Sequence, residues 1–233
     1  KRQSWSSDRY RHYVENIVSR LAIHYGNNPT VIGWQIDNEP GHYGVVDYSE
    51  NAQAKFRIWL QKKYGTIDKL NDTWGASFWS ETYQNFEQVR LPNQQEVPDK
   101  ANPHAMLDLN RFMADELAGF VNMQADILRR HIHKDQWITT NLIPIFNPVD
   151  PVRIDHPDFL TYTRYLVTGH NQGIGSQGFR MGIPEDLGFS NDQFRNRVGK
   201  AFGVMELQPG QVNWGVYNPQ PLPGAIRMWV YHV

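Results

Sequence analysis

Three things that the chain lacks narrow its possible functions before any motif is considered. The 233 residues include no cysteine, which excludes disulfides, thiolate nucleophiles and thiolate metal sites. No apolar run approaches the ~18 residues that a membrane-spanning helix needs. Neither sign of charge is in excess, because 23 Lys and Arg face 24 Asp and Glu. A chain this balanced has no basic footprint for nucleic acid, so we expect neither a nucleic acid nor a membrane as partner.

Aromatic residues, in contrast, are abundant. The chain has 8 Trp, 11 Tyr and 11 Phe, within a hydrophobic fraction of 40%. This length and composition are ample for a buried core in one large domain or two small ones. Part of the aromatic content belongs to that core, and the remaining rings are surfaces on which sugars can stack.

Both ends of the chain indicate that it is part of a longer protein. The sequence begins at Lys1, with neither an initiating methionine nor the pattern of a signal peptide. At the other end, the residues from Arg227 to Val233 stop inside an apolar-periodic segment that has no capping residue. The compartment therefore cannot be read from the sequence.

Helical and strand-like patterns alternate between these ends. Apolar residues at three- and four-residue spacings predict helices over residues 10–25, 49–64 and 109–128, and a shorter helical turn that ends near Trp74. Short apolar runs predict strands over residues 31–36, 137–142, 159–167 and 201–206. The first run is almost wholly apolar, which is typical of a strand buried on both faces. Strands separated by helices predict parallel βαβ units.

A doubly wound sheet and a (β/α)8 barrel both fit this alternation, and the polar residues decide between them. Asn38 and Glu39 follow the first predicted strand, Asn141 lies late in the second, and Glu206 ends the last. Polar groups at the carboxyl ends of several strands converge on one mouth in a barrel. A barrel averages ~250 residues for eight units, whereas about four strands are predicted here. We therefore expect an α/β fold in which this chain is roughly the second half of a TIM barrel with a helical insertion.

The two strand-end carboxylates carry the functional hypothesis. Glu39 and Glu206 each follow an apolar strand, where a carboxylate is costly to desolvate unless it has a partner or a role. When two carboxyl groups face each other, the pKa of one rises above that of the other, which divides them into a proton donor and a nucleophile. Glycoside cleavage needs this division, with a separation of ~5–5.5 Å for retention and ~6.5–9.5 Å for inversion. The alternative is that either glutamate is only a salt-bridged strand-end residue.

Two motifs resemble those of a known family. The runs VIGWQIDNEPG (residues 31–41) and MELQPGQVNW (residues 205–214) resemble family 42 of the glycoside hydrolases, the bacterial β-galactosidases of clan A. The resemblance covers nearly the whole chain and includes LNDTWG (residues 70–75) and TTN (residues 139–141).

The resemblance implies a fold and a role for each site residue. Residues 1–233 would be strands four to seven of a single (β/α)8 catalytic barrel that lacks its first strands and its end. Glu39 would be the general acid/base on strand four, and Glu206 the nucleophile on strand seven of a retaining exo-β-galactosidase. The resemblance further assigns substrate contacts or support to three residues: Asn38 to the sugar 2-hydroxyl, Trp214 to stacking on the galactosyl unit, and Tyr165 to support of the nucleophile.

The resemblance also implies the ligands and partners. The substrate would be a β-galactoside or a related oligosaccharide, and the protein a homotrimer or another homo-oligomer. Many members carry a zinc-binding cysteine cluster after the acid/base, but residues 47–56 contain no Cys, so neither a metal nor another cofactor is expected. Tyr162-Thr163 replace the usual Trp-Asp pair, and Pro40 replaces the usual Tyr.

Some alternatives and weaker signals remain. The same glutamates would serve another clan-A specificity, such as a β-glucosidase or an α-L-arabinopyranosidase, or a non-catalytic sugar-binding relative. Residues 173–178 satisfy G-x-G-x-x-G, but residues 179–184 are not expected to begin the helix that a dinucleotide site needs. His42 and His170 are predicted in loops near the mouth, where they could touch substrate. Trp34 is expected to be a core ring rather than a sugar platform, and half a barrel is not expected to fold or work alone.

Overall fold

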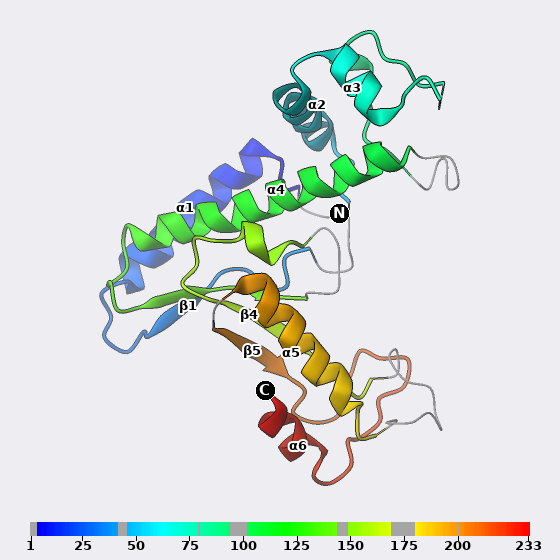
Figure 1. Cartoon of the computed structure of the whole chain (residues 1–233). Coiled ribbons are helices and arrows are strands. Elements are labelled where there is room, and N and C mark those ends of the chain that lie inside the picture. The colour runs from blue at the N-terminus through cyan, green and yellow to red at the C-terminus, as the bar shows by residue number, and fades with distance from the viewer. Residues whose placement is uncertain are drawn as a thin grey trace.

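The computed structural model describes residues 4–41, 46–78, 80–93, 102–143, 149–168, 180–199 and 201–233. Its helices are α1 (Asp8–Tyr25), α2 (Glu50–Tyr64), α3 (Ile67–Trp74), α4 (Pro103–Arg129), α5 (Pro184–Val198) and α6 (Ala225–His232). Its strands are β1 (Gly33–Gln35), β2 (Trp137–Thr139), β3 (Asn141–Leu142), β4 (Leu160–Arg164) and β5 (Phe202–Leu207) (Figure 1). Within these ranges, no helix is both long enough and apolar enough to cross a bilayer.

All five strands pair in parallel, in two sheets with the orders β1-β2 and β3-β4-β5. The single strand predicted over residues 137–142 is therefore observed as two, divided at Thr140. Thr140 forms hydrogen bonds towards both sheets. Its hydroxyl donates to the Ile36 carbonyl at 2.6 Å, just after β1, and its own carbonyl accepts from the Thr161 N–H of β4 at 3.0 Å. Thr140 thus joins the two sheets.

The strands of the described chain form an open array and do not close into a barrel. β1 and β5 are its two outer strands, each with one neighbour. The prediction that the first strand is buried on both faces is wrong for this chain, since Ile32 is 70% exposed and Gln35 is also exposed. The reason is that no strand of the described chain covers the outer edge of β1.

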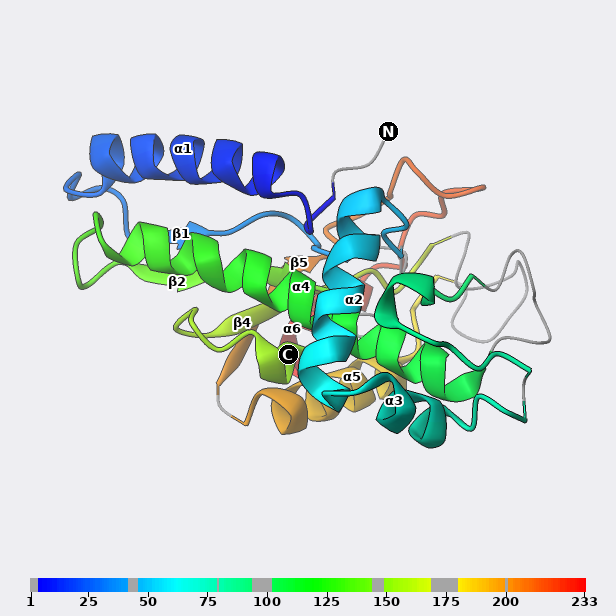
Figure 2. The ribbon, with the colours of Figure 1, turned by 90° about the horizontal axis from the view of Figure 1, so that it is seen from above.

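α1 and α4 lie side by side over the strands (Figure 2). Each helix begins at a side-chain cap that satisfies otherwise unpaired N–H groups: Ser7 accepts from the Tyr10 N–H, and Asn102 accepts from the His104 N–H just before α4. Their inner faces join the strands in the main hydrophobic core, which includes Ala22, Ile36, Leu117, Val121, Ile138 and Tyr162. Trp34 packs against this core, as predicted.

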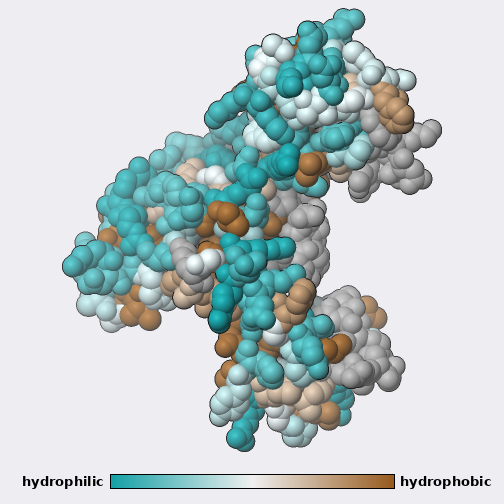
Figure 3. Space-filling model, viewed as in Figure 1, coloured by the Kyte–Doolittle hydropathy of each residue, from teal (hydrophilic) through white to brown (hydrophobic). Residues whose placement is uncertain are grey.

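The helical insertion between β1 and β2 has a hydrophobic core of its own. α2 and α3 pack against the first half of α4 and form the upper lobe in Figures 1 and 3. Phe56, Trp74 and Phe112 are central to this second core. A buried carboxylate, Asp108, lies beneath it and contacts all three helices, with Lys63, Tyr64 and Trp74 as donors. The face shown in Figure 3 is mostly hydrophilic, with apolar patches scattered over the upper lobe and over the rest of the molecule.

α5 is the element that the sequence pattern missed. The segment expected not to begin a helix ends at Pro184, which is the first residue of α5. Proline is suited to this position, because its fixed φ matches the helix and its missing N–H would have no helical partner. Leu187 and Phe194 of α5 are fully buried, and Phe194 stacks near Tyr162 of β4.

We predict that Asp108→Ala lowers the free energy of unfolding of the insertion by about 3 kcal/mol, because the Lys63 ammonium, the Tyr64 hydroxyl and the buried Trp74 indole N–H lose their common buried acceptor. Hydrogen exchange in peptides from α2 and α3, measured in the full-length protein, reports this change. Asp72→Ala, at an exposed position of α3, is the control, with an expected effect within ~0.5 kcal/mol. Equal exchange in the two variants would contradict the prediction.

Candidate active site

The carboxyl ends of β1, β3, β4 and β5 bring the predicted site residues together. Asn38 and Glu39 follow β1, Tyr165 follows β4, and Glu206 is the second-last residue of β5. They meet around Asn141 of β3, whose side-chain amide lies between the Glu39 backbone N–H at 3.2 Å and the Glu206 Oε1 at 3.0 Å. One amide group therefore separates the backbone of one glutamate from the carboxylate of the other.

The turn that carries Glu39 has an unusual backbone. Asp37 and Glu39 adopt φ values of 48° and 49°, a left-handed conformation that is uncommon for residues other than glycine and often marks a functional site. Gly41 ends the turn at φ 82°, and a Cβ there would lie 2.7 Å from Val149 and 2.8 Å from Leu117. Only glycine fits this position, so the sequence Asn38-Glu39-Pro40-Gly41 fixes the path of the turn.

Asp37 ties this turn to the helical layer. Its carboxylate accepts a hydrogen bond of 2.7 Å from Gln124 of α4. Burial raises the pKa of the Asp37 carboxyl, and the bond from Gln124 opposes that rise. Because Gln124 is itself buried, the bond anchors the turn to α4.

A β-bulge determines where Glu206 points. Tyr162 pairs with Val204, but the next residue of β4, Thr163, pairs with Glu206, so Met205 is an extra residue in β5. Tyr162 faces α5, where its ring lies 5.1 Å from that of Phe194. Side chains alternate between the two faces of a regular strand, which would turn Glu206 towards α5 with Val204. The extra residue reverses this, and Glu206 lies on the same face as Thr163 and Asn141.

Tyr165 bonds the second oxygen of the Glu206 carboxylate. Its hydroxyl donates to Glu206 Oε2 at 2.8 Å. Burial, the hydrogen bond to Glu206 and the negative charges of Glu206 and Glu39 together raise the pKa of Tyr165 to about 12. Both carboxylates thus act on one phenol, which stays a neutral donor through the physiological range.

Two further contacts complete this edge of the site. Gln208 is fully buried, and its Oε1 accepts from the backbone N–H groups of Leu166 at 3.0 Å and Val167 at 2.8 Å, which fixes the chain just after Tyr165. Trp214 is 50% exposed and meets the Tyr165 ring edge-on, with centroids 5.3 Å apart. An exposed indole beside Tyr165, the hydrogen-bond donor to Glu206, is a surface on which a sugar ring can stack.

Sequence reasoning missed the polar side chains that link the strands. Asn141 was noted as a polar strand-end residue and as part of the TTN motif, Thr163 was noted only as a departure from the family pattern, and Gln35 was not singled out. Gln35 Nε2 donates to Asn141 Oδ1 at 2.9 Å, and Asn141 Nδ2 lies 3.0 Å from Thr163 Oγ1. The available signal was a polar residue on the inner face of each otherwise apolar strand.

Three predicted features lie outside the described residues: His42, His170 and the G-x-G-x-x-G segment over residues 173–178. Among the residues that are described, no group of three or more His, Asp or Glu side chains is arranged to hold a metal ion.

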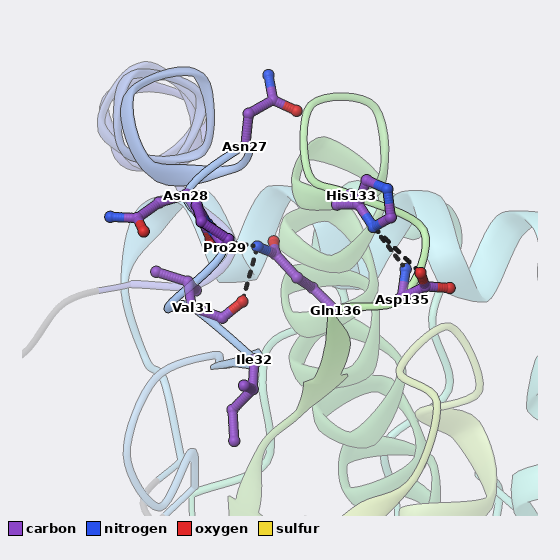
Figure 4. Close-up of a pocket in the computed structure, with 8 residues that line it drawn as sticks. All are labelled: Asn27, Asn28, Pro29, Val31, Ile32, His133, Asp135 and Gln136. Carbon is purple, nitrogen blue, oxygen red and sulfur yellow. Dashed lines mark hydrogen bonds and ion pairs between the residues drawn. The ribbon is translucent and has the colours of Figure 1, made fainter.

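A cavity of about 300 Å³ lies at the opposite ends of the strands, before β1 and β2. Figure 4 shows that its polar groups bond to the protein itself: Gln136 Nε2 donates to the Val31 carbonyl at 2.9 Å, and His133 contacts Asp135. Ligands of parallel α/β sheets bind at the carboxyl ends of the strands. This cavity is therefore not the candidate active site.

The arrangement at the carboxyl ends is suited to acid–base and nucleophilic chemistry at a single carbon. Both oxygens of Glu206 receive hydrogen bonds, from Asn141 and Tyr165, which fix the orientation of the carboxylate. Glu39 is half-buried on the neighbouring turn. Two carboxylates so placed can supply one nucleophile and one proton donor.

The raised pKa of Tyr165 yields a direct test. We predict that its phenol remains protonated up to about pH 11, because burial and two nearby carboxylates oppose phenolate formation. An ultraviolet difference titration of wild type against Tyr165→Phe measures this group alone. The two titrations should coincide below about pH 11, and a difference signal centred near the ordinary tyrosine pKa of ~10 would contradict the assignment.

Comparison with known proteins identifies the family of the chain. The sequence model of glycoside hydrolase family 42, described as β-galactosidase, matches residues 1–233. The β-galactosidase BgaA of a Thermus species is 37% identical over 235 residues, which cover 97% of this chain and 36% of that protein.

Solved structures give the same result. The β-galactosidase of the psychrophilic Marinomonas ef1 superposes with a TM-score of 0.89 at 34% identity, over 97% of this chain and 35% of that one. A catalytic glutamate mutant of a family 42 β-galactosidase from G. stearothermophilus superposes with a TM-score of 0.82 at 29% identity, over 98% of this chain and 34% of that one. The chain thus spans about a third of the length of these relatives. On the family match and these likenesses, the chain belongs to family 42 of the glycoside hydrolases, the β-galactosidase family.

Proposed function

We propose that this chain carries the catalytic centre of a retaining exo-β-galactosidase, with Glu206 as nucleophile and Glu39 as general acid/base. The observation that carries the proposal is the pair of hydrogen bonds on Glu206, from Asn141 and Tyr165, beside the backbone of Glu39. Membership of the β-galactosidase family supports the galactoside as substrate.

The reaction follows two balanced displacements. In the first, a Glu206 oxygen bonds to the anomeric carbon as the glycosidic C–O bond breaks, and Glu39 gives its proton to the leaving oxygen. In the second, Glu39 takes a proton from water while the water oxygen bonds to the anomeric carbon and releases Glu206. Two inversions leave the configuration unchanged, and both carboxyl groups return to their starting states.

Two residues are assigned to the galactosyl unit. Asn38 donates from its side-chain amide to the sugar 2-hydroxyl, a contact that strengthens as the oxocarbenium-like transition state forms. Trp214 offers its exposed indole as a stacking face. Tyr165 acts through Glu206 and keeps one carboxylate oxygen in place.

We further propose that the chain is strands four to seven of a (β/α)8 barrel. The parallel order of the strands and the two unpaired outer edges support this, as does the greater length of the relatives. On this proposal the first strands and the end of the barrel come from regions outside residues 1–233. A homotrimer or another homo-oligomer stays a prediction from the family resemblance.

Azide rescue tests the two glutamate roles in the full-length protein. With an aryl β-galactoside, Glu206→Gly should lose activity and regain it with azide, giving the inverted α-galactosyl azide, because the anion occupies the space of the lost nucleophile. Glu39→Gly is the matched comparison and should give the retained β-galactosyl azide from the galactosyl-enzyme. Near-normal activity of Glu206→Gly without azide would refute the nucleophile assignment.

The specificity is tested separately with nitrophenyl glycosides. We predict that kcat/KM is highest for the β-D-galactoside among the β-D-galactoside, the β-D-glucoside and the α-L-arabinopyranoside. Because all three would use the same two glutamates, a clear preference for one of the others changes the substrate but leaves the mechanism. Absence of turnover on the whole panel would favour a non-catalytic sugar-binding relative.

A further inference from the structure

We propose that Asn141 is a positioning residue that couples the turn of the general acid/base to the nucleophile through one buried side-chain amide. The inference rests on the proposed roles of Glu39 and Glu206. It concerns a residue that would not touch the substrate and would act only through these two groups and Asn38.

The orientation of the Asn141 amide is fixed by the chemistry of its two opposite neighbours. The backbone N–H of Glu39 can only donate, so it must face Oδ1, from which it lies 3.2 Å away. The Glu206 carboxylate accepts, so it must face Nδ2, which lies 3.0 Å from Oε1. A side chain without both a donor and an acceptor cannot satisfy both glutamates.

Every other contact of this amide reaches another strand or turn of the site. Oδ1 also accepts from Gln35 Nε2 at 2.9 Å, and Nδ2 also lies 3.1 Å from Asn38 Oδ1 and 3.0 Å from Thr163 Oγ1. Asn141 is fully buried, so water does not compete for these bonds, and the low local dielectric strengthens them. The amide therefore holds β1, β4 and β5 in one relative position.

The same contact orients the proposed ligand of the sugar 2-hydroxyl. Asn38 is bonded to Asn141 through its Oδ1, so its Nδ2 is the atom that can donate to a substrate hydroxyl. Asn141 thereby fixes which end of the Asn38 amide is presented. The Nδ2 group of Asn141 lies within hydrogen-bond distance of Asn38, Thr163 and Glu206. A substitution of Asn141 therefore affects both glutamates and Asn38 together.

The Asn141 bond also orients the nucleophile. Asn141 Nδ2 holds Glu206 Oε1 at 3.0 Å, while the Tyr165 hydroxyl holds Oε2 at 2.8 Å. An aspartate at position 141 has nearly the same shape but would set one carboxylate against another. The expected result is a slower attack by Glu206 with little change in substrate binding.

The test uses full-length Asn141→Asp, Asn141→Ala and a control, Thr140→Val. Thr140 is adjacent in the chain and equally buried, and it bonds across to β1 through the Ile36 carbonyl at 2.6 Å. The hydrogen bonds described for Thr140 reach Ile36 and Thr161 rather than either glutamate. Thr140→Val therefore reports the loss of a buried hydrogen bond between strands without a change at the two glutamates. Thermal melting of each variant gives the structural cost.

The probe is 2-deoxy-2-fluoro-β-D-galactosyl fluoride, which traps a nucleophilic carboxylate and whose fluoride leaves without help from the acid. We expect trapping at Glu206 to slow by about 100-fold in Asn141→Asp, as when one preorganised donor is lost. A smaller slowing is expected in Asn141→Ala and none in Thr140→Val. We also expect kcat of Asn141→Asp to fall by a similar factor, with KM nearly unchanged.

The labelling results separate a failure of the proposed function from a failure of the role of Asn141. A wild-type label on a residue other than Glu206, located by peptide mass spectrometry, overturns the proposed function itself. A wild-type label on Glu206 with an unchanged trapping rate in folded Asn141→Asp overturns only the role of Asn141. If Asn141→Asp does not fold, Asn141→Ala decides in the same way. If neither folds, Asn141 is a residue of stability and the proposal is overturned.

Discussion

The common direction of the five strands is the constraint on which the candidate site depends. Because β1 to β5 all pair in parallel, their carboxyl ends lie at one edge, and residues far apart in the chain meet there. Glu39 and Glu206 come from the first and last of these strands. The side-chain amide of Asn141, on a strand between them, contacts both residues. The hydrogen bond from Gln124 of α4 to Asp37 anchors the turn after β1 at this edge.

The features that local chemistry determines could be predicted from the sequence. The apolar spacing of α1, α2 and α4 follows from burying one face of each helix, and the βαβ alternation implies parallel strands. The same alternation predicts Glu39 and Glu206 at the ends of strands, where the structure has them, after β1 and near the end of β5. Trp34 was expected in the core for a similar reason, since it precedes the turn on an apolar strand, and it packs there.

The rest depends on contacts between distant segments, which periodicity does not encode. The extra residue at Met205 reverses the face of Glu206, yet nothing in the run Val204-Met205-Glu206 marks a bulge. Residues 179–184 were not expected to begin a helix, although Pro184 is the first residue of α5, because proline occurs both in loops and at the first position of a helix. The bonds of Asn141 to Glu39 and Glu206 span more than sixty residues in each direction, so only the folded chain reveals them.

The most direct measurement of the central claim is the separation of the Glu39 and Glu206 carboxyl groups in a crystal structure of the complete protein. The account predicts ~5–5.5 Å, the distance of a retaining pair in which one carboxylate attacks and the other delivers the proton. A separation of ~6.5–9.5 Å would indicate an inverting enzyme that activates water instead. Carboxyl groups pointing to opposite sides of the strand edge would contradict the pairing altogether.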